Sequence, residues 1–283
     1  MPAPVYVNRP PAQDVSRFGL LSIASMPTDG GDRAVFNGIE YELPPTPEAV
    51  SDPAACIGVS DTPLDWDTAG MRGKPTGESD PIRAWAGFEC ATVGLTEQEV
   101  SDFARTKLAA AEGVFLEDQL WSHTSPALMS DDTVLIGQYG GLSLRAAIGY
   151  LERSLHKDYA GVGAIHIPRE LAAYADELGI VHQSGSKLTT MLGTPISFGA
   201  YPNTDVDGVA AADGTFWIAA SGDVSIRRSE VRVTARVDHR HNNWHGIAER
   251  TFVVAFDQVS YAIPVSLPSD FIPTPAPEPE PEP

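Results

Sequence analysis

The chain has 283 residues, of which 42% are hydrophobic and 20% charged, a globular balance that suffices for one large domain or two medium ones. Asp and Glu outnumber Lys and Arg by 38 to 19, and the formal net charge of −19 argues against direct binding of nucleic acid, whose phosphates such a surface repels. No run of about 18 apolar residues predicts a membrane helix and the N-terminus lacks a signal-peptide pattern, so we expect a soluble, intracellular chain. Cys56 and Cys90 are too few for a disulfide framework, and we expect free thiols.

The first part of the chain is rich in turn-forming residues. Residues 1–34 contain MPAP, RPPAQ and PTDGGD with only short apolar runs between them, a pattern typical of an extended arm. The Asn37-Gly38 pair lies between two short apolar runs and predicts a tight hairpin. Residues 44–81 are dense in Pro, Gly, Asp, Ser and Thr, and we expect an extended loop that leaves the body of the protein.

A long helix is predicted over residues 96–121, directly after an aromatic strand at residues 82–94. Thr96 is placed to cap this helix, and Glu99 is placed to complete a capping box. Apolar residues recur every three or four positions, which predicts one buried stripe with Glu112 off it. The stripe consists of Val100, Phe103, Ala104, Leu108, Ala111, Phe115 and Leu120.

The second half of the chain alternates helices and strands and then ends in strands. A helix capped by Ser143 is predicted over residues 142–158, a buried strand at VGAIHIP, and a further helix that closes on Gly179. KLTTMLGTPISFG predicts a short helical turn followed by a strand. Five strands are predicted after it, in TFWIAA, DVSIRRSE, VRVTARVD, AERTFVVAFD and SYAIPVSL. Residues 269–283 are rich in Pro and Glu, which favours an extended, solvated tail.

One loop has the spacing of a metal site. His239, His241 and His245 could offer three imidazoles to zinc, but a tetrahedral site also needs a fourth ligand and a fixed frame. The alternative, which we favour, is a polar loop at a subunit contact with Trp244 resting on a neighbour. A metal-dependent enzyme centred on this loop stays open as a hypothesis from a different class.

Two pairs of adjacent acids are candidates for acid–base catalysis. Such chemistry needs two carboxyl groups in different environments, whereas Glu117-Asp118 and Asp131-Asp132 are interpreted as solvated. The sequence contains no nucleophile elbow, phosphate-binding loop or dinucleotide fingerprint. No catalytic residue, cofactor or metal ligand is therefore assigned, and we expect a protein that assembles and is not an enzyme.

Two adjacent cations interrupt a strand pattern. Because successive side chains of a strand point to opposite faces, Arg227 and Arg228 must lie on different sides of the sheet. They are candidates for ion pairs across an interface, and an exposed strand edge kept soluble by charge is an equal alternative.

The order of these parts resembles the major capsid protein of tailed bacteriophages, which has the Hong Kong 97-like fold that encapsulin shells share. In the second half the similar segments are GAIHIPRELAAYADELGIV, LGTPISFGAYPN, FWIAASGDVSIRRSEV and AERTFVVAFDQVSYAIPV. In the first half, the segment from IRAWAGFECATVG to the end of the long helix is similar to capsid proteins of phages that infect actinobacteria. The resemblance covers about residues 35–268.

The resemblance implies an α+β fold with an N-terminal arm, an extended loop, a spine helix in a peripheral domain, and an axial domain. The implied bounds are 1–34 for the arm, 35–81 for the extended loop region, 82–135 and 230–268 for the peripheral domain with its spine helix at 96–121, 136–229 for the axial domain, and 269–283 for the tail.

The function implied by the resemblance is a major capsid protein. It would self-assemble as hexamers and pentamers into an icosahedral head that encloses double-stranded DNA without sequence-specific binding, in the host cytoplasm and then in the virion. Many capsid precursors of this family carry a helical scaffolding region ahead of the arm; none is recognised here, so we expect a separate scaffolding protein and little or no N-terminal processing. A portal protein and a decoration protein are further candidate partners, and no membrane is involved. An encapsulin-type compartment is the alternative within the same fold.

Contacts between subunits are the sites that the resemblance implies. The candidate residues are Arg227, Arg228, His239, Trp244, Trp66 and Lys74. Some relatives cross-link subunits through a lysine of the extended loop and an asparagine of a neighbour. Lys74 is the only lysine in this loop, and Asn242 or Asn243 would be its counterpart, a pairing that stays open here.

Overall fold

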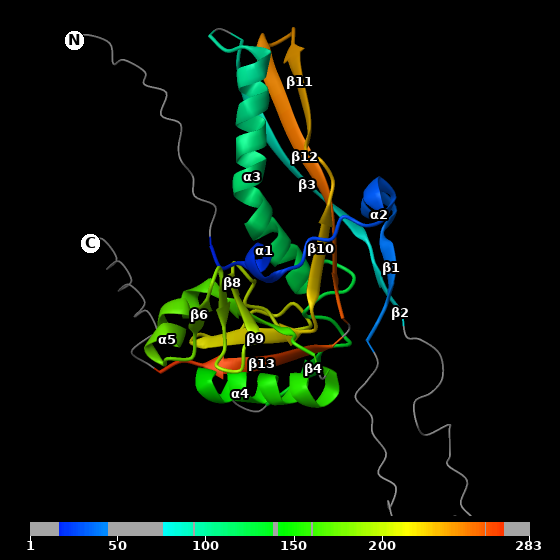
Figure 1. Ribbon diagram of the computed structural model, residues 1–283. Helices are drawn as coiled ribbons and strands as arrows, with labels where there is room; N and C mark the ends of the chain where they lie inside the picture. The colour runs from blue at the N-terminus through cyan, green and yellow to red at the C-terminus, as the bar shows by residue number, and fades with distance from the viewer. Residues whose placement is uncertain are drawn as a thin grey trace, which may run out of the picture.

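The computed structural model describes residues 17–44, 76–92, 94–137, 141–159, 161–257 and 259–268. The chain is elongated, with an arm formed by one long helix on a narrow sheet that rises from a broader body built on a second sheet (Figure 1). Trp66, Lys74, Cys56 and the predicted tail lie outside the described residues. No helix of the described part is long and apolar enough to cross a membrane.

The sheet of the arm has the long strand β12 at its centre. This strand pairs antiparallel with β3 along one edge, and with β11 and β10 at different positions along the other. The bounds are Pro81–Ala91 for β3, Val224–Arg228 for β10, Arg232–Asp238 for β11 and Asn243–Phe256 for β12. Helix α3, Glu97–Ser122, lies along one face of this sheet and contacts β12, β3 and β11.

The body is organised around a seven-stranded mixed sheet in the order β4, β13, β9, β5, β8, β7, β6. The strand bounds are Val134–Leu135 (β4), Ala164–Pro168 (β5), His182–Ser184 (β6), Lys187–Thr189 (β7), Pro195–Gly199 (β8), Thr215–Ser221 (β9) and Ser260–Ser266 (β13). Helix α4, Leu144–Ser154, continues as the π-helical turn η1, Leu155–Tyr159, and contacts β13. The short turn η2, Arg169–Leu171, leads into α5, Ala172–Glu177.

The N-terminal elements connect these two parts. They are α1 (Leu20–Ile23), α2 (Gly31–Asn37), β1 (Ile39–Glu42) and β2 (Thr76–Ser79). Residues 17–34 were predicted to be part of an extended N-terminal segment. Within them, α1 buries Leu20 and Ile23 at the place where the arm of α3 and its sheet meets the body. The short apolar run FGLLSI is therefore buried against its own chain, which its length and composition did not predict.

The hairpin predicted at Asn37-Gly38 is wrong. Asn37 ends α2, Gly38 turns the chain with φ of 81°, and β1 follows and pairs antiparallel with the distant β2. A Cβ at residue 38 would lie 2.6 Å from the Ser79 carbonyl oxygen, so only glycine permits this approach. The two-stranded ribbon thus joins the two ends of the predicted extended loop.

The capping box of the long helix is confirmed. Thr96 accepts a hydrogen bond from the Glu99 amide, and the Glu99 carboxylate accepts one from the Thr96 amide at 2.8 Å. The predicted stripe is correct at Val100, Ala104, Leu108 and Leu120, but Phe103 is 41% exposed and Ala111 is exposed as well. Instead, two acids and a tryptophan are buried, because the fold supplies partners for them: Glu112, Glu117 and Trp121.

Two further expectations differ from the structure. The helical turn predicted in KLTTMLG is the strand β7, which forms a hairpin with β6. The predicted domain bounds also differ from the sheets, since β10 pairs in the arm although it was assigned to the axial domain, and β13 pairs in the body although it was assigned to the peripheral domain. The placement of β10 and β13 is decided by pairing with the distant strands β12 and β9, which a linear pattern does not encode. The remaining predicted strands and the helices starting at Ser143 and ending at Gly179 are confirmed.

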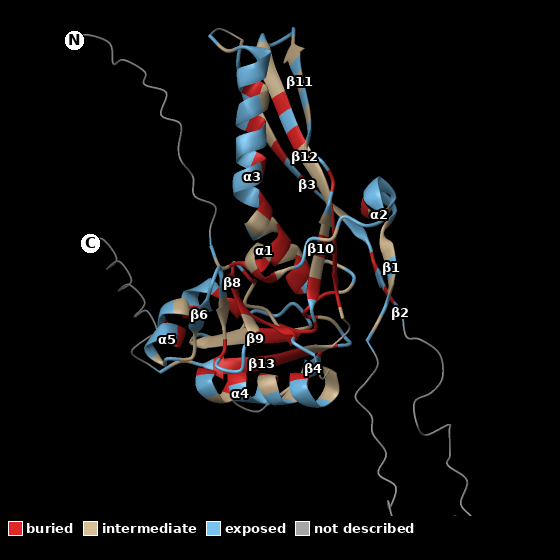
Figure 2. Cartoon of the chain, in the orientation of Figure 1, coloured by how far each residue is buried: buried red, intermediate tan, exposed pale blue. Residues whose placement is uncertain are grey.

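Burial concentrates where the arm meets the body and in the sheet of the body, while the tip of the arm is exposed (Figure 2). One apolar core lies between α3, α1 and the arm sheet, and a second lies between α4 and the body sheet. The base of the arm is thus a buried region that joins the arm to the body.

The Thr96 cap makes a first testable prediction. We expect Thr96→Ala to lower the free energy of unfolding by about 1 kcal/mol, because the Glu99 amide loses its acceptor at the first turn of α3. Thr106→Ala, which removes an exposed hydroxyl bonded to the Asp102 carbonyl of the same helix, is the matched control with a smaller expected effect. Urea denaturation of both variants measures the difference, and an equal loss in the two would contradict the capping role.

Candidate subunit-contact surface and its joint

Glu117 of α3 joins three separate parts of the chain. Its Oε1 accepts a hydrogen bond from the Leu20 amide at 3.0 Å, and its Oε2 accepts one from the Ala200 amide at 2.8 Å. Leu20 belongs to α1 and Ala200 follows β8, so one carboxylate links the long helix, the N-terminal segment and the body. The side chain is only 6% exposed, which makes these two N–H donors its main compensation for lost solvation.

Two glycines leave the room that this carboxylate occupies. A Cβ at Gly19 would lie 2.2 Å from Glu117 Oε1, and a Cβ at Gly199 would lie 2.7 Å from Glu117 Cδ. Any larger residue at either position would therefore displace the carboxylate. Arg169 closes the same region from the body, because its Nη1 donates to the Phe198 carbonyl at 3.1 Å.

Burial raises the pKa of Glu117 above its ordinary value, while the two backbone N–H donors and Arg169 act in the opposite direction. Next to it, Tyr201 packs on Trp121 with ring centroids 5.6 Å apart. The Tyr201 hydroxyl lies 3.0 Å from His166 Nδ1, and burial lowers the pKa of His166 to about 3. His166 is thus neutral at pH 7, whereas Glu117 is the acid at this joint whose pKa burial raises.

A buried ion pair holds the middle of α3 to its sheet. Arg250 Nη1 of β12 lies 3.0 and 2.9 Å from the two carboxylate oxygens of Glu112. The side chains are 16% and 8% exposed, so the pair is largely desolvated and removal of either partner would leave an uncompensated charge. Glu112 and Glu117 together fix the position of α3 on the sheet and on the body.

The face of the arm sheet opposite α3 carries exposed side chains. Ala84, Ala86 and Ala248 point toward α3 and are buried, so their neighbours along the strands point outward. Trp85 and Ile247 on that outer face are 64% and 45% exposed. The charged outward residues are Arg83, Glu89, Arg232, Arg236 and Glu249.

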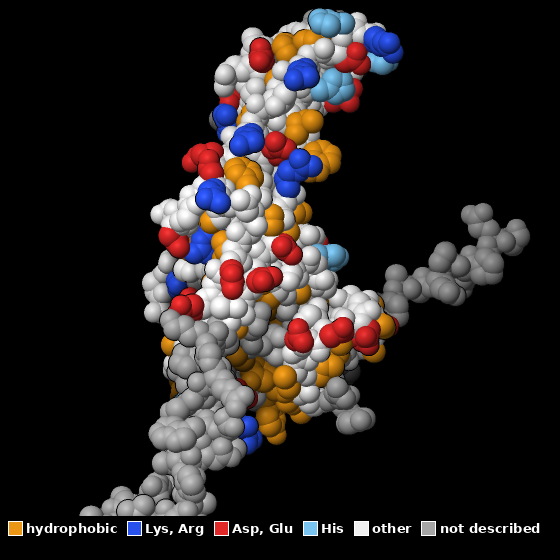
Figure 3. Space-filling model, turned by 90° about the vertical axis from the view of Figure 1, so that its right-hand side faces the viewer, with side chains coloured by type: hydrophobic (Ala, Val, Ile, Leu, Met, Phe, Trp, Pro, Cys, Tyr) orange, Lys and Arg blue, Asp and Glu red, His pale blue; other side chains and the backbone are white. Residues whose placement is uncertain are grey.

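This outer face is a candidate contact surface. Figure 3 shows the arm from the side, with hydrophobic side chains among basic and acidic ones and histidines at the tip. Arg83 and Glu249 pair at 3.5 Å, and Arg232 lies over the Phe36 ring of α2 at 5.0 Å, while Trp85 stands exposed between these charges. An exposed tryptophan rimmed by arginines is the composition found at the centre of protein interfaces.

The structure distributes the predicted contact residues over different places. Arg227 is bound within its own subunit, since its Nη2 lies 3.0 Å from both carboxylate oxygens of Asp29 and its side chain is only 15% exposed. Arg228 lies on the opposite face and is exposed, as the strand period requires. His239 is exposed in the turn between β11 and β12, and Trp244 in β12 is half-buried beside Cys90 of β3.

Two histidines at the tip of the arm contact different carboxylates, His241 from the turn and His245 from the start of β12. His241 Nδ1 lies 2.6 Å from Asp238, and this contact lowers the pKa of Asp238 below its ordinary value. His245 Nε2 lies 3.9 Å from Glu89 on the neighbouring strand. Among the described residues, no group of three or more His, Cys, Asp or Glu side chains is arranged to hold a metal ion.

Sequence reasoning missed Trp85 and Glu117. The alternation of small and large residues in Arg83-Ala84-Trp85-Ala86 could have shown that Trp85 faces outward, because only alanines leave room under a packed helix. No comparable signal marked Glu117, since its two partners lie 97 and 83 residues away in the chain.

A long helix on a four-stranded arm, a two-stranded ribbon at its base and a mixed-sheet body together form the Hong Kong 97-like capsid fold, as the resemblance predicted. A capsid chain of the "empty GTA particle" superposes with a TM-score of 0.54 at 12% identity, covering 94% of this chain and 95% of the other. Chains from Mycobacterium phage Che8 (TM-score 0.53, 12% identity, 92% and 96% covered) and Microbacterium phage Oxtober96 (0.52, 12%, 92% and 95%) are similar as well. No family model matches the sequence, and no curated protein matches it either.

The joint at Glu117 can be tested by titration. We expect Glu117→Gln to lower the free energy of unfolding by about 2 kcal/mol at neutral pH, because the amide of Gln offers one acceptor to two backbone donors. Between the unfolded and the raised folded pKa, the folded chain binds more protons, so its stability falls as the pH rises. The difference between wild type and variant should therefore be larger at about pH 5 than at about pH 7.

Glu97→Gln is the control for this titration, since it removes the same charge at an exposed position of the same helix. Urea denaturation at both pH values measures all three proteins. A difference that is independent of pH, or equal for the two variants, would contradict the role of Glu117.

The outer face can be tested by self-association. We expect Trp85→Glu to abolish association of copies in sedimentation velocity, because a charge replaces the largest exposed apolar side chain of this face. The exposed position should keep the free energy of unfolding within about 0.5 kcal/mol of wild type. Trp85→Phe, which retains an aromatic ring, should still associate, and equal behaviour of the Glu and Phe variants would exclude this face as a contact.

Proposed function

We propose that the chain is the major capsid protein of a tailed phage, which self-assembles into hexamers and pentamers of an icosahedral head around double-stranded DNA. The proposed role is structural, without catalysis, and the proposed location is the virion after assembly in the host cytoplasm. The observation that carries this proposal is the fold, which is shared over almost the whole length of chains from phage and GTA capsids.

Features of the chain itself support the proposal. An exposed Trp85 on the outer face of the arm sheet is costly for a solitary monomer and favourable once a neighbour covers it. The ribbon of β1 and β2 holds both ends of a long Pro/Gly-rich loop, and such a segment offsets its ordering entropy best on partner surface. The net charge of −19 would let packaged DNA enter and leave without adhering to the shell.

The partners proposed with this function follow the same reasoning. The main partner is the chain itself, and the others are a separate scaffolding protein, a portal protein and a decoration protein. An encapsulin-type compartment would use the same fold, so the contents of purified particles distinguish the two functions. Double-stranded DNA inside supports the phage head, and an enzyme cargo supports the compartment.

Electron microscopy of the expressed chain tests the proposal. We expect closed shells from wild type, and none from Ala110→Pro, because proline in the middle of α3 removes a helical hydrogen bond and costs about 3 kcal/mol. Ala110→Ser at the same exposed position keeps the helix and should still give shells. A wild-type chain that stays monomeric even with the products of its neighbouring genes, or normal shells from Ala110→Pro, would overturn the proposal.

A further inference from the structure

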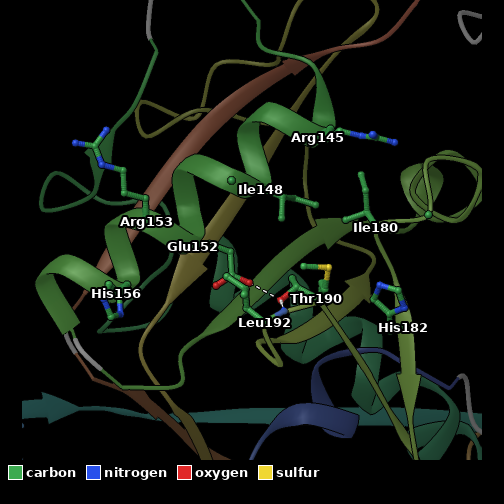
Figure 4. A pocket seen from close by; sticks show the side chains of 12 residues that line it. Arg145, Ile148, Glu152, Arg153, His156, Ile180, His182, Thr190 and Leu192 are labelled. Atoms are coloured by element: carbon green, nitrogen blue, oxygen red, sulfur yellow. Dashed lines mark hydrogen bonds between the residues drawn. The ribbon is translucent and has the colours of Figure 1, made fainter.

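A groove on the body lies beside α4 and is open to solvent. It encloses about 670 Å³ between α4, the segment after α5 and the turn that follows β7 (Figure 4). Ile148 and Ile180 line it, and Met191 and Leu192 stand at its edge with exposed fractions of 84% and 73%. Two neighbouring apolar side chains this exposed indicate a surface that is covered in the working protein.

The groove is lined by basic and acidic side chains of α4, and one of the basic ones, Arg145, donates to the Leu178 carbonyl at 2.7 Å. Arg145 and Arg153 of α4 line it, and neither has an ion-pair partner among the described residues. Glu152 between them is occupied, since the hydroxyl groups of Thr190 and Thr194 donate to its two carboxylate oxygens. The helical rise places the two arginines about 12 Å apart along α4.

One segment of the chain has the complementary composition. Residues 269–283 contain four acids and no Lys, Arg or His, and their apolar residues are six prolines, one alanine, Phe271 and Ile272. Glu278 and Glu282 would be about 12 Å apart in a polyproline II conformation, which matches the spacing of the two arginines.

The position where the strand β13 ends brings this segment to the groove. The Ser266 amide donates to the Leu142 carbonyl at 3.0 Å, and the Leu142 amide donates to the Pro264 carbonyl at 3.0 Å. Helix α4 starts two residues after Leu142. The chain therefore leaves β13 beside the first turn of α4, which contains Arg145. Residues 269–283 reach about 46 Å when extended, against about 17 Å of α4 along the groove.

We propose that the acidic, proline-rich tail, residues 269–283, docks in the α4 groove of its own subunit. Its glutamates pair with Arg145 and Arg153, and its apolar side chains cover Met191 and Leu192. The tail then shields an apolar patch of the body that would otherwise bind other chains. This docking does not depend on the proposed capsid function.

A photo-cross-linking experiment on the full chain tests the docking. A benzophenone amino acid replaces Leu192, and a mixture of isotopically heavy and light protein is irradiated and analysed by peptide mass spectrometry. We expect cross-links from position 192 to residues 269–283, with heavy joined to heavy and light joined to light. Cross-links to any other segment, or between heavy and light chains, would overturn the proposal.

Variants that remove or reverse charges test whether ion pairs hold the tail in the groove. In the cross-linking protein, Arg153→Glu should reduce the yield of tail cross-links by about fivefold, the effect of losing one exposed ion pair. The combined variant Glu278→Gln, Glu280→Gln and Glu282→Gln should reduce it at least as much. Arg236→Glu, an exposed arginine on β11 of the arm, is the matched control and should leave the yield unchanged. Equal yields in all four proteins would show that charge complementarity does not hold the tail.

Discussion

The carboxylate of Glu117 is the contact on which the arrangement of the molecule depends. It accepts hydrogen bonds from the backbone amides of Leu20 and Ala200. Together with the ion pair between Glu112 and Arg250, these bonds set the position of α3 relative to the arm sheet and the body. Both acids are buried, so each would be costly without its partners. These contacts hold the base of the arm to the body, so they set the direction in which the surfaces of the arm point.

The chain divides its contacts between a packed base and exposed outer surfaces. The two cores account for most of the buried apolar side chains, whereas the outer face of the arm sheet keeps Trp85, Ile247 and several arginines in solvent. The groove beside α4 repeats this pattern on the body, with Met191 and Leu192 exposed next to Arg145 and Arg153. Both surfaces combine exposed apolar side chains with arginines, in a chain that is acidic overall.

The sequence predicted features that depend on near neighbours. The capping box of α3, the Ser143 cap, the helix ending at Gly179 and the strands β3, β5 and β9 to β13 follow from spacing and local propensity, and all are present. The prediction of a hairpin at Asn37-Gly38 was wrong. The chain does turn at Gly38, but the strand that follows pairs with β2, which lies beyond the extended loop in the sequence. Arg227 was a candidate for an interface or for an exposed strand edge, and no local pattern indicated the pair that it forms with Asp29, 198 residues away.

What the sequence alone determined was therefore the class of fold, through the order of arm, loop, long helix and alternating elements, and the acidic balance that argues against binding nucleic acid directly. Only the tertiary structure decided which side of α3 is buried and which strands pair. It also showed that Glu117 is a joint and not a solvated acid, and that Trp85 points outward. The physical reason is the same in each case: helix caps and strand periods are set by residues a few positions apart, whereas burial of a charge and pairing of strands depend on partners brought together from tens to hundreds of residues away.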